Sequence, residues 1–240
     1  MPTCRLCHKD KVLRFSHIVP EFLYADLYNE KGHMLGINGR GSKGWKPLQQ
    51  GIREHLFCEE CEQHFNEYCE KPFREQWVVN SPLPNPWNVP EPYWVSVEYS
   101  SFKLFHLSVL FRASVSSLPT FAEAELGPHE ERLRQMLLAK DPGEAWQYPI
   151  FGLALLHHKT KAIVQLVSQV QQGRFGGHRC YAICYGGVQW WVGVASHRSV
   201  DLDGICLQES GRLPLATVPW NELGLIKSAS RLLRETRASL

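Results

Sequence analysis

The sequence predicts an α+β fold, and three observations lead to that class. Two Cys-x-x-Cys pairs in the first third of the chain predict a small unit held together by a metal. Apolar residues at helical spacing predict two helices, over 101–117 and 127–143. In the last third, short apolar stretches and a Gly-Gly hairpin signal predict an antiparallel sheet.

The composition is that of an ordinary globular protein. Hydrophobic residues make up 44% of the chain and charged residues 21%, which suffices for a sizeable core. The net charge of +2 permits a nucleic-acid partner without arguing for one. Because no apolar stretch has the length of a membrane helix and the first residues lack a signal-peptide core, we expect a cytoplasmic protein with no membrane partner. In that compartment the eight cysteines are expected as metal ligands or buried thiols.

The chain divides into three parts. Residues 1–79 hold both cysteine pairs and form the expected zinc-stapled unit. Residues 80–92 contain five prolines and are predicted to be an extended connector. Residues 93–240 form an α/β region with an antiparallel sheet, whose role the sequence leaves open.

The elements of the third part follow from local patterns. Alternation predicts a strand over 93–100, and Ser101 is expected to cap the helix over 101–117. The helix over 127–143 has acidic residues early and ends at Asp-Pro-Gly. Further predicted elements are strands over 148–158 and 161–170, a hairpin over 179–196 that turns at Gly186–Gly187, and a helix over 219–240.

The two cysteine pairs have the spacing of zinc knuckles. A tight turn in each pair puts two thiolates on one metal ion, and two pairs complete a tetrahedral site. Such a site has no open position, so it is structural; chance spacing or a redox pair is the alternative. The predicted ligands are Cys4, Cys7, Cys58 and Cys61, whereas the cysteines expected to be buried are Cys69, Cys180, Cys184 and Cys206.

A known family shares the order of these motifs. Cys4-x-x-Cys7 is followed by Ser-His-Ile-Val-Pro at 16–20 and by LFCEECE at 56–62. This order resembles the HNH endonucleases of the His-Me finger superfamily in their zinc-stapled form, over roughly residues 1–72. The resemblance implies a ββα, treble-clef-like fold in which the first strand ends at the histidine and the helix starts after the second cysteine pair. It also implies metal-dependent cleavage of DNA, with phage defence as a context.

The resemblance assigns roles to individual residues. His17 matches the general base that activates water. The family often has Asp before this base, where it binds the catalytic metal, but this chain has Ser16. The position after the last zinc cysteine is Glu62, which would hold Mg²⁺ or another divalent ion, and His64 is the second candidate. The family's middle Asn is missing from the segment before Cys58, where His55 could instead face the site or cover the zinc.

Each assignment has a structural alternative. His17 beside an apolar run could be a packed core histidine. Glu62 could be a first-turn carboxylate that favours the helix dipole. The remaining acidic side chains of this segment are expected to form a solvated helix face; they are Glu59, Glu60, Glu67 and Glu70.

A Gly-rich loop offers a second kind of site. It carries three cations and an aromatic residue, namely Arg40, Lys43, Trp45 and Lys46. Cations contact phosphates and an aromatic ring can stack on a base, so this loop is a candidate nucleic-acid contact. A flexible surface loop without that role is the alternative.

Three functions follow from these observations. The first is a metal-dependent endonuclease that cleaves DNA with His17 as base. The second is a catalytically degenerate zinc module that binds nucleic acid or a partner protein, with Ser16 marking the lost metal ligand. In the third, residues 93–240 dock a protein partner and the zinc unit is a staple.

Overall fold

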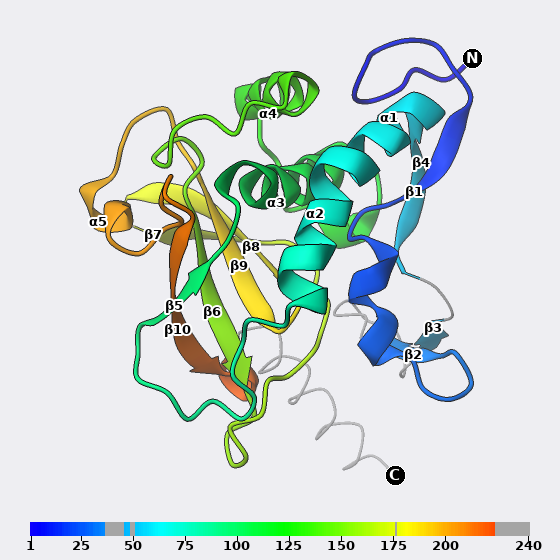
Figure 1. The fold of residues 1–240 in the computed structure, drawn as a ribbon. Coiled ribbons are helices and arrows are strands. Elements are labelled where there is room, and N and C mark those ends of the chain that lie inside the picture. The colour runs from blue at the N-terminus through cyan, green and yellow to red at the C-terminus, as the bar shows by residue number, and fades with distance from the viewer. Residues whose placement is uncertain (37–45, 49–50, 176, 224–240) are drawn as a thin grey trace, which may run out of the picture.

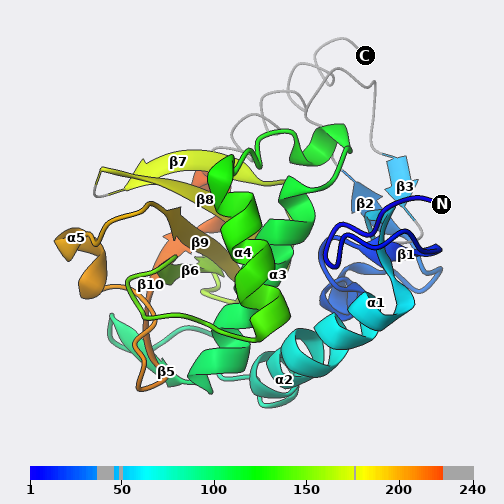
Figure 2. The same cartoon turned by 90° about the horizontal axis from the view of Figure 1, so that it is seen from above.

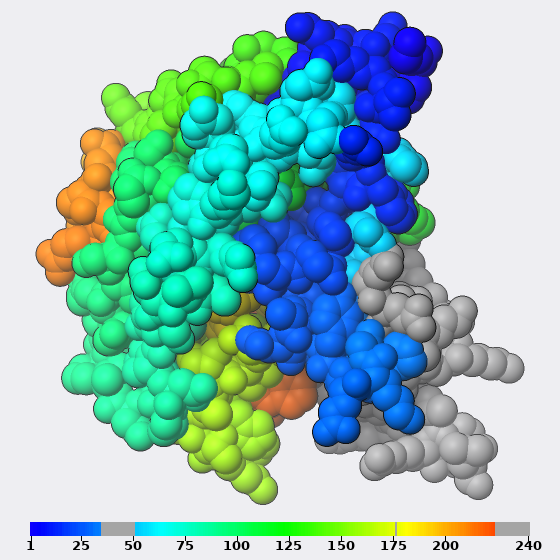
Figure 3. Space-filling view, turned by 45° about the vertical axis from the view of Figure 1, so that its right-hand side comes forward, coloured from blue at the N-terminus to red at the C-terminus, as the bar shows by residue number. Residues whose placement is uncertain are grey.

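The computed structural model describes residues 1–36, 46–48, 51–175 and 177–223. Over these ranges the chain combines helices with a mixed sheet, which confirms the α+β class (Figure 1). Helix α3 lies at the centre, with the sheet on one side and the helical segment that begins at α1 on the other (Figure 2). From one side, that helical segment and the N-terminal residues together cover much of the surface (Figure 3).

The large sheet has six strands in the order β5-β10-β6-β9-β8-β7. All neighbouring pairs are antiparallel except β6 and β10, which run parallel. The predicted hairpin is confirmed, because β8 and β9 pair around Gly186–Gly187, both with positive φ. The strands are β5 (Tyr93–Ser96), β6 (Ile150–Leu156), β7 (Gln171–Phe175), β8 (His178–Tyr185), β9 (Val188–Val194) and β10 (Arg212–Pro219).

The strand predicted over 161–170 is wrong. Both edges of β6 are already occupied, by β9 and β10, so the segment after β6 adds only a single bridge between Leu156 and Ile163. Its apolar side chains still pack, since Val164 and Leu166 contact the buried cluster around Leu155. The apolar pattern therefore reflects burial without a hydrogen-bonded ladder.

Helix α3 (Tyr99–Ser114) is buried on all sides from Phe102 to Ala113. A helix in that position belongs to the interior of a layered structure. Its N-cap is Glu98 and not the predicted Ser101: the Glu98 carboxylate accepts hydrogen bonds from the first-turn amides. Helix α4 (Pro128–Ala139) packs along α3, and α5 (Val200–Asp203) is a single turn.

The N-terminal part contains two pairs of strands and a long helical segment. Strand β1 (Leu13–His17) pairs antiparallel with β4 (Arg53–Cys58), and a short pair joins β2 (Met34–Gly36) to β3 (Lys46–Leu48). Helix α1 (Glu59–Phe65) follows β4 directly and continues through a π-helical turn, α2 (Lys71–Phe73) and a second π-helical turn to Val79. Single 3-10 turns lie at Glu21–Leu23, Ala25–Leu27, Pro119–Phe121 and Trp220–Glu222.

Residues from both predicted parts share one apolar cluster. Phe73 stacks on Phe105 of α3 with ring centroids 3.7 Å apart, and Trp77 meets Trp190 of β9 at 5.0 Å. The indole of Trp77 also donates to the carbonyl of Gly186 in the hairpin turn, at 2.9 Å. The predicted helix over 219–240 lies almost wholly outside the described residues.

Candidate metal centre and hairpin site

Four cysteines come together at the start of the chain. The Sγ atoms of Cys4, Cys7, Cys58 and Cys61 all lie within 4.8 Å of one another. A tetrahedral zinc ion with Zn–S bonds of about 2.3 Å requires sulfurs about 3.8 Å apart. The sulfurs of Cys7 and Cys58 are 3.8 Å apart, so this set fits such an ion.

Local backbone structure prepares this cluster. The first pair lies in a turn that the amide of Cys4 closes by donating to Lys9, and the amide of Arg5 donates to Leu56 of β4. Cys58 ends β4 and caps α1, which places Cys61 in the first helical turn. The order of strand β4, the second cysteine pair and helix α1 therefore brings the thiols of Cys58 and Cys61 together.

A bound cation would stabilise the thiolate forms of these cysteines. Although burial raises the pKa of Cys4, hydrogen bonds from nearby backbone amides lower it below its ordinary value overall. Burial raises the pKa of Cys58 to about 11 and also raises that of Cys61. Four thiolates in one buried cluster repel each other, and a bound metal ion removes that cost.

Strand β1 brings Ser16 against helix α1. The Ser16 side chain is buried, and its hydroxyl donates to Oε1 of Glu62 at 2.5 Å. Burial raises the pKa of Glu62, and the neighbouring charge of Arg112 and the Ser16 hydrogen bond offset only part of this effect. The sequence-predicted ligand position on the helix thus faces the residue before His17.

Arg112 of α3 is a functional candidate that sequence reasoning missed. Its guanidinium is buried, donates to the carbonyl of His17 at 3.1 Å and to Oε1 of Glu70 at 2.5 Å, and lies 4.4 Å from the Phe65 ring. Although burial lowers the pKa of Arg112, the charges of Glu70 and Glu62 raise it overall. A lone arginine inside an apolar helix pattern was the signal, because arginine is rarely buried without a partner.

His17 lies on the opposite face of β1 from Ser16, since side chains alternate along a strand. Its buried Nε2 is 2.7 Å from Oε2 of Glu21, but the two groups lack the alignment of a hydrogen bond. Burial lowers the pKa of His17, Glu21 opposes this shift, and Arg53 adds to it. The lowered pKa favours the neutral form of the imidazole.

Glu21 is itself held in place. Its carboxylate accepts hydrogen bonds from the hydroxyl of Tyr28 at 2.5 Å and from the amide of Gly51 at 3.2 Å. Sequence reasoning did not select Glu21, although its position four residues after His17 was a possible signal.

The other predicted residues occupy different places. His64 lies two positions after Glu62 on the helix and so faces elsewhere, with Nε2 2.7 Å from the carbonyl of Leu137. His55 is exposed on β4. Of the acidic residues expected on a solvated face, three are exposed and form ion pairs: Glu59 with Arg14, Glu60 with Lys11 and Glu67 with Lys71. The fourth, Glu70, turns inward to Arg112.

The Gly-rich loop lies largely outside the described residues. Arg40, Lys43 and Trp45 belong to the undescribed segment, and Lys46 is described only as part of the backbone of β3. Among the described residues, the four cysteines are the one group of three or more metal-ligating side chains of His, Cys, Asp and Glu type.

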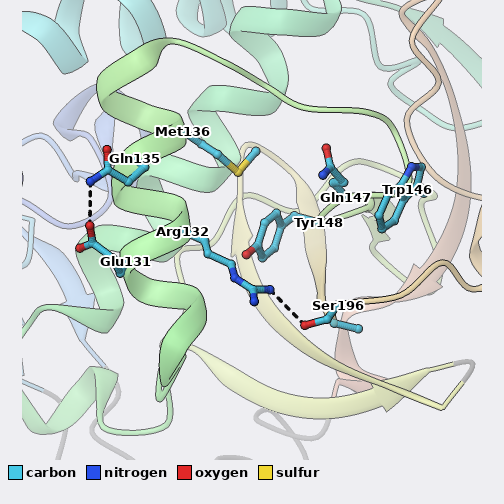
Figure 4. Close-up of a pocket in the computed structure, with 9 residues that line it drawn as sticks. Glu131, Arg132, Gln135, Met136, Trp146, Gln147, Tyr148 and Ser196 are labelled. Atoms are coloured by element: carbon cyan, nitrogen blue, oxygen red, sulfur yellow. Dashed lines mark hydrogen bonds between the residues drawn. The ribbon is translucent and has the colours of Figure 1, made fainter.

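A shallow pocket of about 390 Å³ lies between α4, the segment before β6 and the end of β9. Figure 4 shows Arg132 reaching from α4 to the hydroxyl of Ser196, with Tyr148 and Met136 beside it. None of the residues selected from the sequence lines this pocket.

Comparison with known proteins adds no relative. No protein-family model, no curated protein and no solved structure matches this chain. In the described part of the chain, every helix is too short or too polar to cross a membrane.

Proposed function

We propose that strands β1 and β4 and helix α1, stapled by zinc, form an HNH-type, treble-clef-like unit. This unit hydrolyses DNA phosphodiester bonds with a divalent metal ion. One observation carries this proposal: a histidine at the end of β1 follows a serine that touches Glu62, the first helix residue after a four-cysteine cluster. The resemblance implies that Ser16 and Glu62 lie together in this way. It also places the base on the side of the strand that faces the helix, whereas His17 points to the other face of β1.

His17 would act as the general base. Its lowered pKa favours the neutral form of the imidazole, and Nε2 faces the carboxylate of Glu21. Because Nε2 is buried beside Glu21, Nδ1 is the ring nitrogen left to take a proton from water. The carboxylate then stabilises the imidazolium, and Arg112 holds the backbone of His17 in place.

Glu62 and Ser16 would hold the divalent ion. Mg²⁺ in phosphate-processing sites is commonly bound by one or two protein carboxylates together with substrate phosphates. One carboxylate and one hydroxyl therefore fit an ion that arrives with the substrate. Such an ion stabilises the negative charge that develops on the phosphate. His64 is left out of this set because it contacts Leu137.

Cleavage of plasmid and linear DNA by the zinc-loaded protein tests this proposal, with Mg²⁺, with Mn²⁺ and without added metal. We expect metal-dependent cleavage that His17→Ala reduces by at least about 100-fold, the usual contribution of a general base. The melting temperature should change little. Strong destabilisation with activity retained would make His17 a packing residue and would refute its assignment as base.

A second candidate function has its own supporting observation. The buried guanidinium of Arg112 already brings a positive charge to Glu62 and Glu70, which disfavours another cation there. The unit would then be a degenerate zinc module that binds nucleic acid without cutting it. Mn²⁺ binding followed by electron paramagnetic resonance separates the two: the nuclease requires a site that Glu62→Gln removes in the presence of DNA, and the binding module has none.

A further inference from the structure

The face of strands β1 and β4 that points away from helix α1 carries an exposed aromatic cluster. Phe15 is 51% exposed, and it directly follows an irregularity in the pairing of β1 with β4, between Arg14 and Phe15. Its ring stacks with that of His55 on β4, with centroids 4.9 Å apart and planes 28° apart. The guanidinium of Arg53 lies 4.8 Å from the same ring centroid. The exposed phenyl ring thus has two cross-strand neighbours that fix its orientation.

This cluster shares a face with the candidate base. Ser16 points to helix α1, so Phe15 and His17 on either side of it point the other way. In the strand register, His55 is opposite Phe15 and Arg53 is opposite His17. The four side chains therefore form two adjacent cross-strand pairs, and a ligand on Phe15 is next to His17.

We propose that Phe15, His55 and Arg53 form a stacking site for an unpaired base of single-stranded nucleic acid, whose backbone phosphate Arg53 contacts. The inference rests on the proposed function, because it names the form of substrate that reaches His17. Stacking on an aromatic ring needs a free base face, which duplex DNA does not offer. Arg53 supplies the charge that complements a phosphate.

Two acidic side chains lie near this cluster, and each is held by hydrogen bonds within the protein. The carboxylate of Glu21 accepts from Tyr28 and Gly51 and contacts His17. Glu54, also on β4, accepts hydrogen bonds from Ser116 and Ser117. Both carboxylates thus have donors within the protein.

Binding of labelled oligonucleotides, followed by fluorescence anisotropy without added divalent metal, tests the site in the full-length protein. The probes are a short oligothymidine, an abasic strand of the same length and the corresponding duplex. Phe15→Ala should weaken oligothymidine binding about 5- to 150-fold, since one base stack is worth about 1–3 kcal/mol. It should leave binding of the abasic strand unchanged.

Phe175→Ala is the matched control. Phe175 is also an exposed phenylalanine on a strand: it is 43% exposed and lies on β7 of the six-stranded sheet. Its replacement should leave oligothymidine binding intact. Equal binding of the three probes by the wild type, no oligonucleotide binding at all, or an effect of Phe15→Ala no larger than that of the control would overturn the site.

The outcome is separable from that of the cleavage assay. Stacking that depends on Phe15 without any cleavage would retain the site in a binding module. Cleavage of duplex DNA that is insensitive to Phe15→Ala would retain the nuclease and refute this site. A stable melting temperature in Phe15→Ala, expected for a half-exposed side chain, makes the binding change attributable to the lost ring.

Discussion

The charges of Glu62, Glu70 and Arg112 act on one another between helices α1 and α3, and their balance sets the chemistry there. Arg112 donates to Glu70, and its charge also acts on Glu62. The pKa of Glu62 nevertheless stays above its ordinary value because burial outweighs these favourable contacts. Removing a carboxylate from water costs free energy that a single shared cation does not return in full. Glu62 is therefore a group held in a strained electrostatic state, which is common where a residue serves function.

Glu62→Gln should stabilise the protein at neutral pH. The folded-state pKa of Glu62 is raised, so its carboxyl favours folding most below the unfolded pKa of about 4.3, and this contribution is lost as the pH rises. Glutamine stays neutral throughout. Urea midpoints should thus favour Glu62→Gln at about pH 7.5, and the advantage should shrink toward pH 5. Glu59→Gln, at an exposed position of the same helix, is the control and should show no such trend.

The four-cysteine cluster acts at the scale of the element, because it joins the first turn of the chain to the start of α1. Strands β1 and β4 alone form a two-stranded sheet, and an isolated pair of strands is marginal in water. A metal bound by the four cysteines would link these two strands to helix α1. The register that sets Ser16 against Glu62 then depends on the metal.

Cys58→Ser should abolish zinc binding and lower the stability of the protein strongly, because the free energy of binding a structural zinc is folding free energy. Zinc content by mass spectrometry and the melting temperature measure both effects. Cys180→Ser is the control: Cys180 is equally buried but lies on β8, outside the cluster. If Cys58→Ser keeps its zinc, the four-cysteine site is refuted.

Local patterns predicted the elements that local interactions determine. The cysteine spacing, the Gly-Gly hairpin and the periodicity of α3 each contain their cause within a few residues. The strand expected over 161–170 failed because free sheet edges are a property of the assembled sheet. Arg112 and Glu70 were missed as a pair for the same reason, since 42 residues separate them and only packing of α3 on the helical segment brings them together.

For the whole molecule, the question is whether residues 1–79 are an independent unit. Aromatic contacts join this part to the rest, notably those of Phe73 with Phe105 and of Trp77 with Trp190. Trp77 also fills the space beside Gly186, where an added Cβ would lie 3.0 Å from the indole. A core that is continuous across a predicted boundary favours one cooperative structure over two.

Unfolding should therefore release zinc and expose the sheet in one step. Six of the eight tryptophans lie in residues 80–240, so tryptophan fluorescence reports mainly on that part, while a colorimetric chelator reports on zinc release. In urea the two transitions should coincide, as two-state unfolding requires. Zinc release complete well below the fluorescence midpoint would instead show that residues 1–79 unfold alone. The predicted division of the chain would then be a division of stability, and the contacts of Trp77 would be too weak to couple its parts.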